Sequence, residues 1–99
     1  MTNSRKTALN PDVVAAPLKP YYSNAVRSDA GPLLWISGQV ALDAKGELVG
    51  KGDLRAQAVQ VLENIKGILE DSNATMDDIV KVTVYVTDIG AFNSIADIR

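Results

Sequence analysis

The chain has 99 residues, which suits one domain, and its formal net charge is −2. Hydrophobic residues make up 46% and charged residues 22%, the profile of a globular rather than a disordered protein. The chain contains neither cysteine nor histidine, which excludes disulfides, thiol nucleophiles, Cys/His metal sites and imidazole chemistry. Any catalysis must use carboxylates, arginine, lysine, tyrosine, hydroxyls, backbone groups and water.

The charge balance also bears on partners and location. With a pI of about 4.9 and no basic cluster, the chain lacks the positive surface that nucleic-acid binding needs. Arg5 and Lys6 are not followed by the apolar stretch of a secretory signal, and no apolar run reaches transmembrane length. We therefore expect a soluble cytoplasmic protein with no nucleic-acid or membrane partner.

The first third of the chain predicts strands around an irregular segment. Arg5–Leu9 predicts a short edge strand that ends at Asn10-Pro11. The prolines that follow favour an extended surface segment up to position 20. Ala25–Asp29 predicts a second strand, and Ala30-Gly31-Pro32 predicts a turn that pairs it with the next strand.

That next strand is expected to organise the fold. Leu33–Ile36 is an unbroken apolar run, too short for a helix and suited to a buried strand, which Val40–Leu42 would prolong. Between them lies Ser37-Gly38-Gln39. Glycine weakens a strand by roughly 0.5–1 kcal/mol relative to alanine, so Gly38 calls for a reason. A bulge and the close approach of a backbone or a ligand are both common, and the residues alone favour the bulge.

The clearest predicted element is a helix from Asp53 to about Ser72. A turn at Asp43–Gly46 and a glycine-flanked connection at Glu47–Gly52 lead into it. Asp53 is placed to cap its first turn, and Asn73 can end it in a left-handed conformation. One apolar stripe runs along it, made of Leu54, Ala58, Val61, Leu62, Ile65, Ile68 and Leu69.

The last quarter predicts a strand and the start of a second helix. In Ile79–Val86 valines alternate with polar residues, and the β-branched content favours a strand whose valine face packs on the long helix. The other face, with Lys81, Thr83, Tyr85 and Thr87, suits a subunit contact or a polar barrel interior. A second helix follows Asp88-Ile89-Gly90, with Phe92, Ile95 and Ile98 on one side. It reaches Arg99 without a cap, so we expect residues 1–99 to be one domain that lacks its closing strands.

The candidate site residues are Tyr22, Ser37 and Gly38. The phenol of Tyr22 either reaches a pocket or packs on its own loop, and the sequence leaves both open. Ser37-Gly38 offers a hydroxyl and an approachable backbone N–H; without histidine a serine nucleophile has no evident base, so Ser37 suits a hydrogen-bond donor. Asp77-Asp78 favours a solvated turn over a site. These residues alone predict an α+β domain with a candidate small-ligand site.

Several segments match one known family, namely Tyr22–Val26, Leu34–Val40, Gln57, Asn64-Ile65 and Ile79–Asp88. In them the chain resembles the reactive intermediate deaminase A family, also called RidA/YjgF, in the right order from Pro17 to Arg99. The resemblance implies a chorismate-mutase-like α+β fold, a mixed sheet with two helices packed on one face, assembled as a homotrimeric barrel with sites between subunits. Members hydrolyse reactive enamine/imine intermediates such as 2-iminobutanoate to 2-oxo acids and ammonia, with no cofactor or metal.

Carried over, Tyr22 matches the family's pocket tyrosine, and Ser37 and Gly38 match residues that line its substrate site. The family's carboxylate-binding arginine and water-activating glutamate are expected beyond Arg99, which itself belongs to the second helix. The catalytic groups are therefore unknown here, and residues 1–99 alone are expected to be inactive. Ala96 stands where the family tends to have asparagine. Some members lack the arginine and the activity, so a non-enzymatic ligand-binding or regulatory trimer is the alternative; the acidic pI disfavours a ribonuclease.

Overall fold

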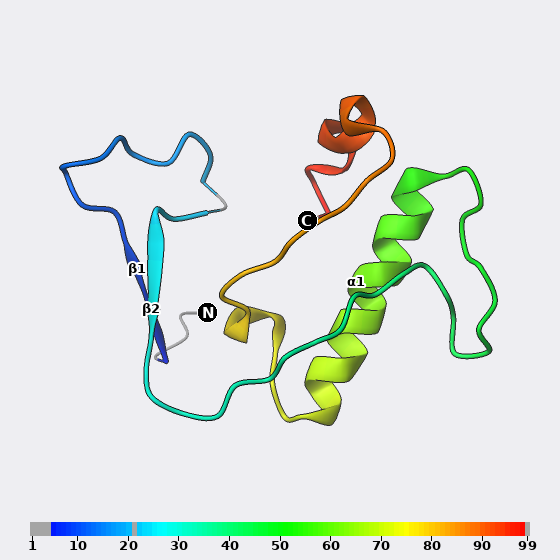
Figure 1. The fold of residues 1–99 in the computed structure, drawn as a ribbon, viewed down its shortest axis with the longest axis horizontal. Helices are drawn as coiled ribbons and strands as arrows, with labels where there is room; N and C mark the ends of the chain where they lie inside the picture. The colour runs from blue at the N-terminus through cyan, green and yellow to red at the C-terminus, as the bar shows by residue number, and fades with distance from the viewer. Residues whose placement is uncertain (1–4, 21, 99) are drawn as a thin grey trace. The chain divides into compact units, whose positions relative to one another are not determined.

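The computed structural model describes residues 5–20 and 22–98, which fall into two compact units. One unit contains the chain up to Leu33 together with Met76–Val82, and the other contains Leu34–Thr75 together with Thr83–Arg99. The described elements are a two-stranded antiparallel sheet, one α-helix and two 3₁₀ helices (Figure 1). The expected α+β class is therefore confirmed.

The sheet belongs to the first unit. Strand β1 (Lys6–Leu9) pairs antiparallel with β2 (Ala25–Ser28), with Lys6 opposite Ser28 and Leu9 opposite Ala25. Both strands were predicted, but the predicted partner of the second was wrong, because β2 pairs with β1 rather than with Leu33–Ile36. The intervening loop is folded back by Asn24, whose backbone N–H donates to Asn10 Oδ1 at 2.9 Å and whose Nδ2 donates to the Ala15 carbonyl at 3.0 Å.

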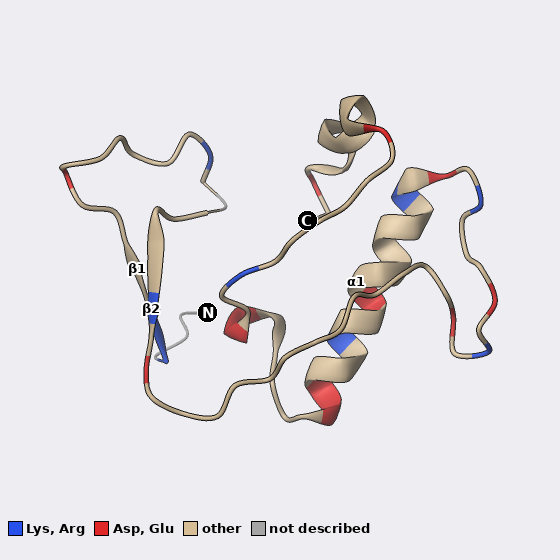
Figure 2. Cartoon of the chain, in the orientation of Figure 1, with Lys and Arg blue, Asp and Glu red and all other residues tan. Residues whose placement is uncertain are grey.

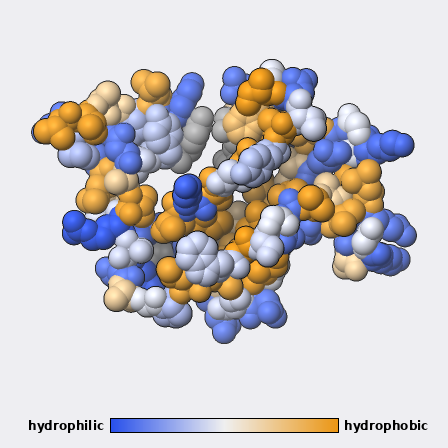
Figure 3. Space-filling view, viewed as in Figure 1, coloured by the Kyte–Doolittle hydropathy of each residue, from blue (hydrophilic) through white to orange (hydrophobic). Residues whose placement is uncertain are grey.

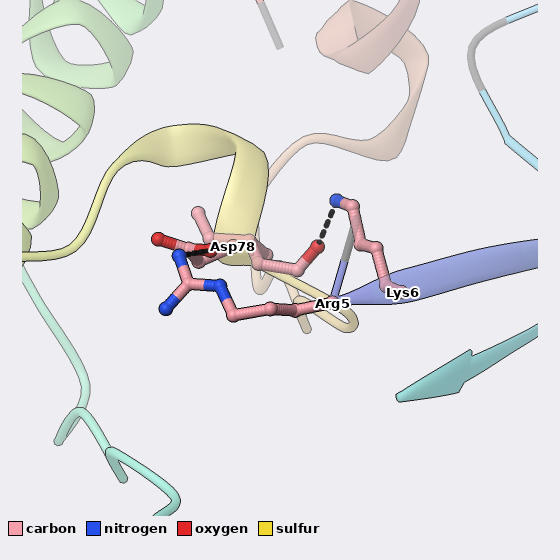
Figure 4. Close-up of polar contacts among 4 residues, drawn as sticks. Arg5, Lys6 and Asp78 are labelled. Carbon is pink, nitrogen blue, oxygen red and sulfur yellow. Dashed lines mark hydrogen bonds and ion pairs between the residues drawn. The ribbon is translucent and has the colours of Figure 1, made fainter. Parts of the chain in front are cut away.

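A short 3₁₀ helix, η1 (Met76–Asp78), is tied to the start of β1 in the same unit. The Arg5 guanidinium forms an ion pair with the Asp78 carboxylate, and Lys6 Nζ donates to the Ile79 carbonyl at 3.0 Å (Figure 4). The Asp78 side chain is only 16% exposed. The prediction of a solvated turn is therefore wrong for Asp78, because the guanidinium partner replaces water at its carboxylate.

Helix α1 (Leu54–Asp71) dominates the second unit, and both of its predicted ends are confirmed. Asp53 is the N-cap, and its Oδ1 accepts the Ala56 N–H at 3.1 Å. At the other end Asn73 has a positive φ of 59°, and its N–H bonds the Glu70 carbonyl at 3.1 Å. The Ala74 N–H bonds the Leu69 carbonyl at 2.8 Å, which completes a Schellman motif.

The predicted turn before α1 is also confirmed. Asp43 Oδ1 accepts the backbone N–H groups of Lys45 at 2.9 Å and Glu47 at 3.0 Å. Gly50, four residues before the start of α1, has a φ of +77°, and a Cβ there would lie 2.7 Å from the Ala56 Cβ. Both the backbone conformation and the space therefore require glycine at position 50.

The second predicted helix is present, but as the 3₁₀ helix η2 (Ile89–Ile95) rather than an α-helix. It contacts α1, and Asp88 caps it by accepting the Gly90 N–H at 3.0 Å. Ile95 is buried on the expected side, at 4% exposed. The placement of Arg99 in this helix lies outside the described residues.

Two predicted strands, Leu33–Ile36 and Ile79–Val86, are wrong for this structure. Within residues 5–20 and 22–98 neither segment forms a strand. Val80, Val82 and Val84 are 53, 63 and 51% exposed, so the valine face does not form a packed layer. The reason is that a strand needs a neighbouring backbone for its hydrogen bonds, whereas a helix contains its own partners. The described core is correspondingly small, and its buried hydrophobic side chains are Ala41, Leu69 and Ile95.

Candidate functional site

Tyr22 lies in the first unit, on the loop that joins β1 and β2. Its phenol oxygen accepts the backbone N–H of Leu18 at 2.9 Å, and the residue is 46% exposed. Of the two roles that the sequence left open, this contact favours packing on its own loop. The residue as a whole remains about half-exposed to solvent.

Ser37 and Gly38 lie in the second unit, in a segment without regular structure. A Cβ added to Gly38 would meet no atom within 4 Å among the described residues. Without a strand ladder there is no bulge, so the favoured explanation of Gly38 is wrong here. Gly38 is therefore open on its Cβ side, and a ligand could reach its backbone there.

Directly after this segment the chain bends at Ala41. The Leu42 N–H bonds the Val40 carbonyl at 2.8 Å, which is the hydrogen bond of a γ-turn. The Ala41 side chain at its centre is buried, at 8% exposed. The predicted continuation of the strand through Val40–Leu42 is thus replaced by a turn.

Helix α1 holds this turn through a residue whose role the sequence reasoning missed. Asn64 Nδ2 donates to the carbonyls of Val40 at 3.2 Å and Leu42 at 3.0 Å. Gln60 Nε2 donates to Asn64 Oδ1 at 2.8 Å. The family resemblance included Asn64 without giving it a role. A polar amide beside the apolar stripe of a helix was the signal that could have pointed to it.

Among the titratable groups, an ion pair joins α1 to the turn after η2. Arg55 donates to both carboxylate oxygens of Asp97, at 3.0 and 2.5 Å. Hydrogen bonding to Arg55 lowers the pKa of Asp97, and hydrogen bonding to Asp97 raises the pKa of Arg55. The pair connects two elements, and its chemistry is that of a surface salt bridge rather than of an acid–base catalyst.

The structure gives the local surroundings of each predicted site residue. Tyr22 belongs to the first unit and Ser37 and Gly38 to the second, so a cleft shared by them stays a prediction. Among the residues described, no group of three acidic side chains is placed to hold a metal ion. No helix in this part of the chain is long and apolar enough to cross a membrane.

Comparison with known proteins identifies the family. A family model described as Endoribonuclease L-PSP matches residues 13–99. A crystal structure of YyfB from Yersinia pestis, titled a protein of unknown function of the conserved Rid family, is 35% identical with a TM-score of 0.78. That match covers 94% of this chain and 71% of the Yersinia chain. The chain belongs to the RidA/YjgF family.

Two curated relatives extend the comparison. A RutC family protein of Pyrococcus horikoshii is 49% identical over 77 residues, which are 77% of this chain and 58% of that protein. A 2-iminobutanoate/2-iminopropanoate deaminase of Dermatophagoides farinae is 31% identical over 90 residues, covering 87% of this chain and 69% of that protein. The resemblance found in the sequence is therefore confirmed at the level of the RidA/YjgF family.

Proposed function

We propose that this chain acts in the hydrolytic deamination of reactive enamine/imine intermediates such as 2-iminobutanoate, in the cytoplasm. The observation that carries the proposal is the 31% identity, over 87% of the chain, to a protein named as such a deaminase. Because the chain spans 58% of the length of its Pyrococcus relative, the activity is proposed for the polypeptide of family length. In that polypeptide we propose that residues 1–99 belong to one domain.

The proposed reaction fits the residue types present. Water adds to the C=N carbon of the 2-imino acid, the C–N bond breaks, and a 2-oxo acid and ammonia are released. The imine carbon is already electrophilic, so the protein needs to place water and supply a base rather than a strong nucleophile. Hydroxyl donors, backbone N–H groups, arginine and carboxylates suffice, and the chain's lack of cysteine and histidine is no obstacle.

Roles for the candidate residues follow from their chemistry. The Ser37 hydroxyl and the Gly38 N–H are proposed to donate hydrogen bonds to the substrate, supported by the open space at Gly38. Tyr22 is proposed to add a phenol to the same cleft. The resemblance to the family assigns the substrate carboxylate to an arginine, and water activation to a glutamate, both beyond Arg99. An arginine suits that role because it binds a carboxylate through two parallel hydrogen bonds.

The assembly proposed with this function is a homotrimer of chorismate-mutase-like subunits with the sites between them. It is supported by large side chains that remain open to solvent, such as Trp35 and Tyr85 at 85 and 91% exposed. Hydrophobic groups are visible on the surface drawn in Figure 3. Sedimentation equilibrium of the family-length protein should give a trimer, and a monomer at micromolar concentration would contradict the assembly.

A non-enzymatic trimer that binds a small ligand is the second candidate. The Yersinia relative is similar in fold at 35% identity and its title assigns no function, so membership of this fold does not by itself imply the deaminase. A ribonuclease, the word in the family model's description, is disfavoured by the net charge of −2. Lysine and arginine are also interspersed with acidic residues along the described chain (Figure 2).

The deciding experiment measures 2-oxobutanoate formed from freshly generated 2-iminobutanoate. The 99-residue chain is assayed beside the longest natural polypeptide that contains it. We expect acceleration by the longer protein and none by the short chain. If neither protein accelerates the reaction but the longer one still binds a 2-oxo acid, the deaminase proposal is rejected in favour of the ligand-binding trimer. Full activity of the short chain would contradict the proposed arginine and glutamate.

Substitutions in the longer protein then test the site residues. Tyr22→Phe and Ser37→Ala should each lose one hydrogen bond, which is about 0.5–1.5 kcal/mol or roughly a 2- to 13-fold loss in kcat/KM. Ser28→Ala, at the exposed end of β2, is the matched control and should leave the rate unchanged. Wild-type rates and ligand affinities in both site variants would show that these residues are not part of the site.

A further inference from the structure

We infer that Asn64 is a positioning residue that orients the Ser37–Gly38 segment from helix α1; the kinetic part of this inference rests on the proposed function. The observation is the set of hydrogen bonds at its amide. Both N–H groups of Nδ2 are used, one on the Val40 carbonyl and one on the Leu42 carbonyl. Oδ1 accepts from Gln60, one turn earlier on the same helix, which fixes the direction in which the amide faces.

These hydrogen bonds matter for the candidate site because the turn lies directly after Ser37 and Gly38 in the chain. The γ-turn at Val40–Leu42 is anchored by the buried Ala41, whereas Val40 is 63% exposed. Ser37 and Gly38 precede it by only a few residues and form no strand ladder within residues 5–20 and 22–98. The orientation of the Ser37–Gly38 segment relative to α1 is therefore set by the turn that follows it. In Figure 1 the chain meets α1 where Asn64 bonds the Val40 and Leu42 carbonyls.

A displaced segment matters for a reaction that depends on placing water and substrate. Errors of about 1 Å in such placement can cost on the order of a hundredfold in rate. Asn64 itself is proposed to touch neither substrate nor water. Its effect on the rate should therefore pass through the positions of Ser37 and Gly38. A residue that only stabilises the fold would lower the stability of the protein when substituted, without changing the rate of the molecules that remain folded.

The variant that tests the role is Asn64→Asp, which keeps the shape but turns an oxygen instead of an N–H₂ towards the two carbonyls. In the family-length protein it should lower kcat/KM for 2-iminobutanoate at least about tenfold at a temperature where the variant is still folded. Glu63→Gln, at the exposed neighbouring position on α1, replaces a carboxylate oxygen by an NH₂ group, the reverse of the exchange in Asn64→Asp. It should have no effect on kcat/KM. Gln60→Leu should have a smaller effect, because Asn64 keeps both bonds to the turn.

A double-mutant cycle distinguishes positioning from a structural role. If Asn64 acts through Ser37, the Asn64→Asp/Ser37→Ala double variant should be about as slow as Asn64→Asp alone. Losses that multiply would place the effect of Asn64 elsewhere and overturn the inference. A wild-type kcat/KM for Asn64→Asp would overturn it as well.

A second measurement does not depend on any activity. In amide NMR spectra of Asn64→Asp, the signals of Ser37 and Gly38 should shift or broaden, while those of β1 (Lys6–Leu9) stay in place. Unchanged Ser37 and Gly38 signals would overturn the positioning role whatever the protein catalyses. Shifted signals in a protein without imine hydrolysis would instead sustain the positioning role and reject the proposed function.

Discussion

Helix α1 and the segment Ile79–Val86 carry equally regular sequence patterns, yet of these two segments only α1 forms regular structure. The helix bonds each backbone N–H to a carbonyl four residues earlier and so contains its own partners. A strand must find its partners on another segment, and Ile79–Val86 has no such neighbour within residues 5–20 and 22–98. Periodicity therefore shows which structure a segment is suited to, while the available neighbours decide whether it forms.

The two segments also differ in whether local residues determine where they begin and end. Single residues fix where α1 begins and ends, because Asp53 and Asn73 act on backbone groups a few positions away. No single residue fixes an end of Ile79–Val86 in this way. The conformation of α1 should therefore depend mainly on residues within and next to it, whereas that of Ile79–Val86 should depend on the segments that pack beside it.

The largest expected effect comes from comparing a buried side chain of α1 with an exposed valine. Leu69 is 5% exposed and Val84 is 51% exposed. Leu69→Ala should lower the free energy of unfolding by about 2–5 kcal/mol, because it removes buried methyl groups and leaves a cavity. Val84→Ala should change it by less than about 0.5 kcal/mol. Denaturant unfolding followed by circular dichroism measures both, and a loss at Val84 as large as that at Leu69 would break the contrast.

The next effect concerns the entry to α1. Gly50→Ala would combine a positive φ with a Cβ 2.7 Å from the Ala56 Cβ, and it should cost roughly 2–4 kcal/mol of unfolding free energy. Gly52→Ala is the matched control, because Gly52 also has a positive φ but open space around its Cβ position. It should cost only about 1–2 kcal/mol for the backbone conformation. Equal losses in the same unfolding experiment would mean that packing against Ala56 adds nothing.

A smaller effect is expected at the helix cap. Asp53→Ala removes the acceptor of the Ala56 N–H and should lower the free energy of unfolding by about 1 kcal/mol. Asp71→Ala, at the opposite end, removes a negative charge from the negative end of the helix dipole, so it should raise stability by a few tenths, about 0.3 kcal/mol. Changes of the same sign in thermal unfolding would argue against a local electrostatic origin.

The smallest effect is the pH dependence of the Arg55–Asp97 pair, whose side chains are 53 and 62% exposed. Hydrogen bonding to Arg55 lowers the pKa of Asp97 below its ordinary value of 3.8. The pair's contribution to stability is therefore complete above that value and is lost as the pH falls through the lowered pKa of the folded state. Asp97→Asn should remove this acid-side dependence and leave stability near neutrality almost unchanged. An NMR titration giving Asp97 an ordinary or raised pKa would contradict the ion pair.

The elements that the sequence predicted well are those with local causes. The cap at Asp53, the terminator at Asn73 and the turn at Asp43–Gly46 each act over a few positions, so residue type was enough. The pairing of β2 with β1 depends on a loop folded back by Asn10 and Asn24, which no periodicity encodes. The same limit explains the two unformed strands.

The candidate site shows this limit more sharply. Residue chemistry pointed to Ser37 and Gly38, and their role in a site stays a prediction. The contact of Tyr22 with Leu18 was one of two alternatives that the sequence could not separate. The bonds from Asn64 to Val40 and Leu42 span 24 and 22 positions, so only the folded chain could reveal them.

Backbone amide hydrogen exchange of the 99-residue chain tests the contrast between α1 and the valine segment most directly. We predict strong protection along α1 from Gln57 onward, where the backbone N–H groups have carbonyl partners. The amides of Val80–Val86 should exchange close to the rates of an unstructured chain. Protection at alternating positions from Val80 to Val86, as strong as in α1, would show a formed strand ladder and contradict the account.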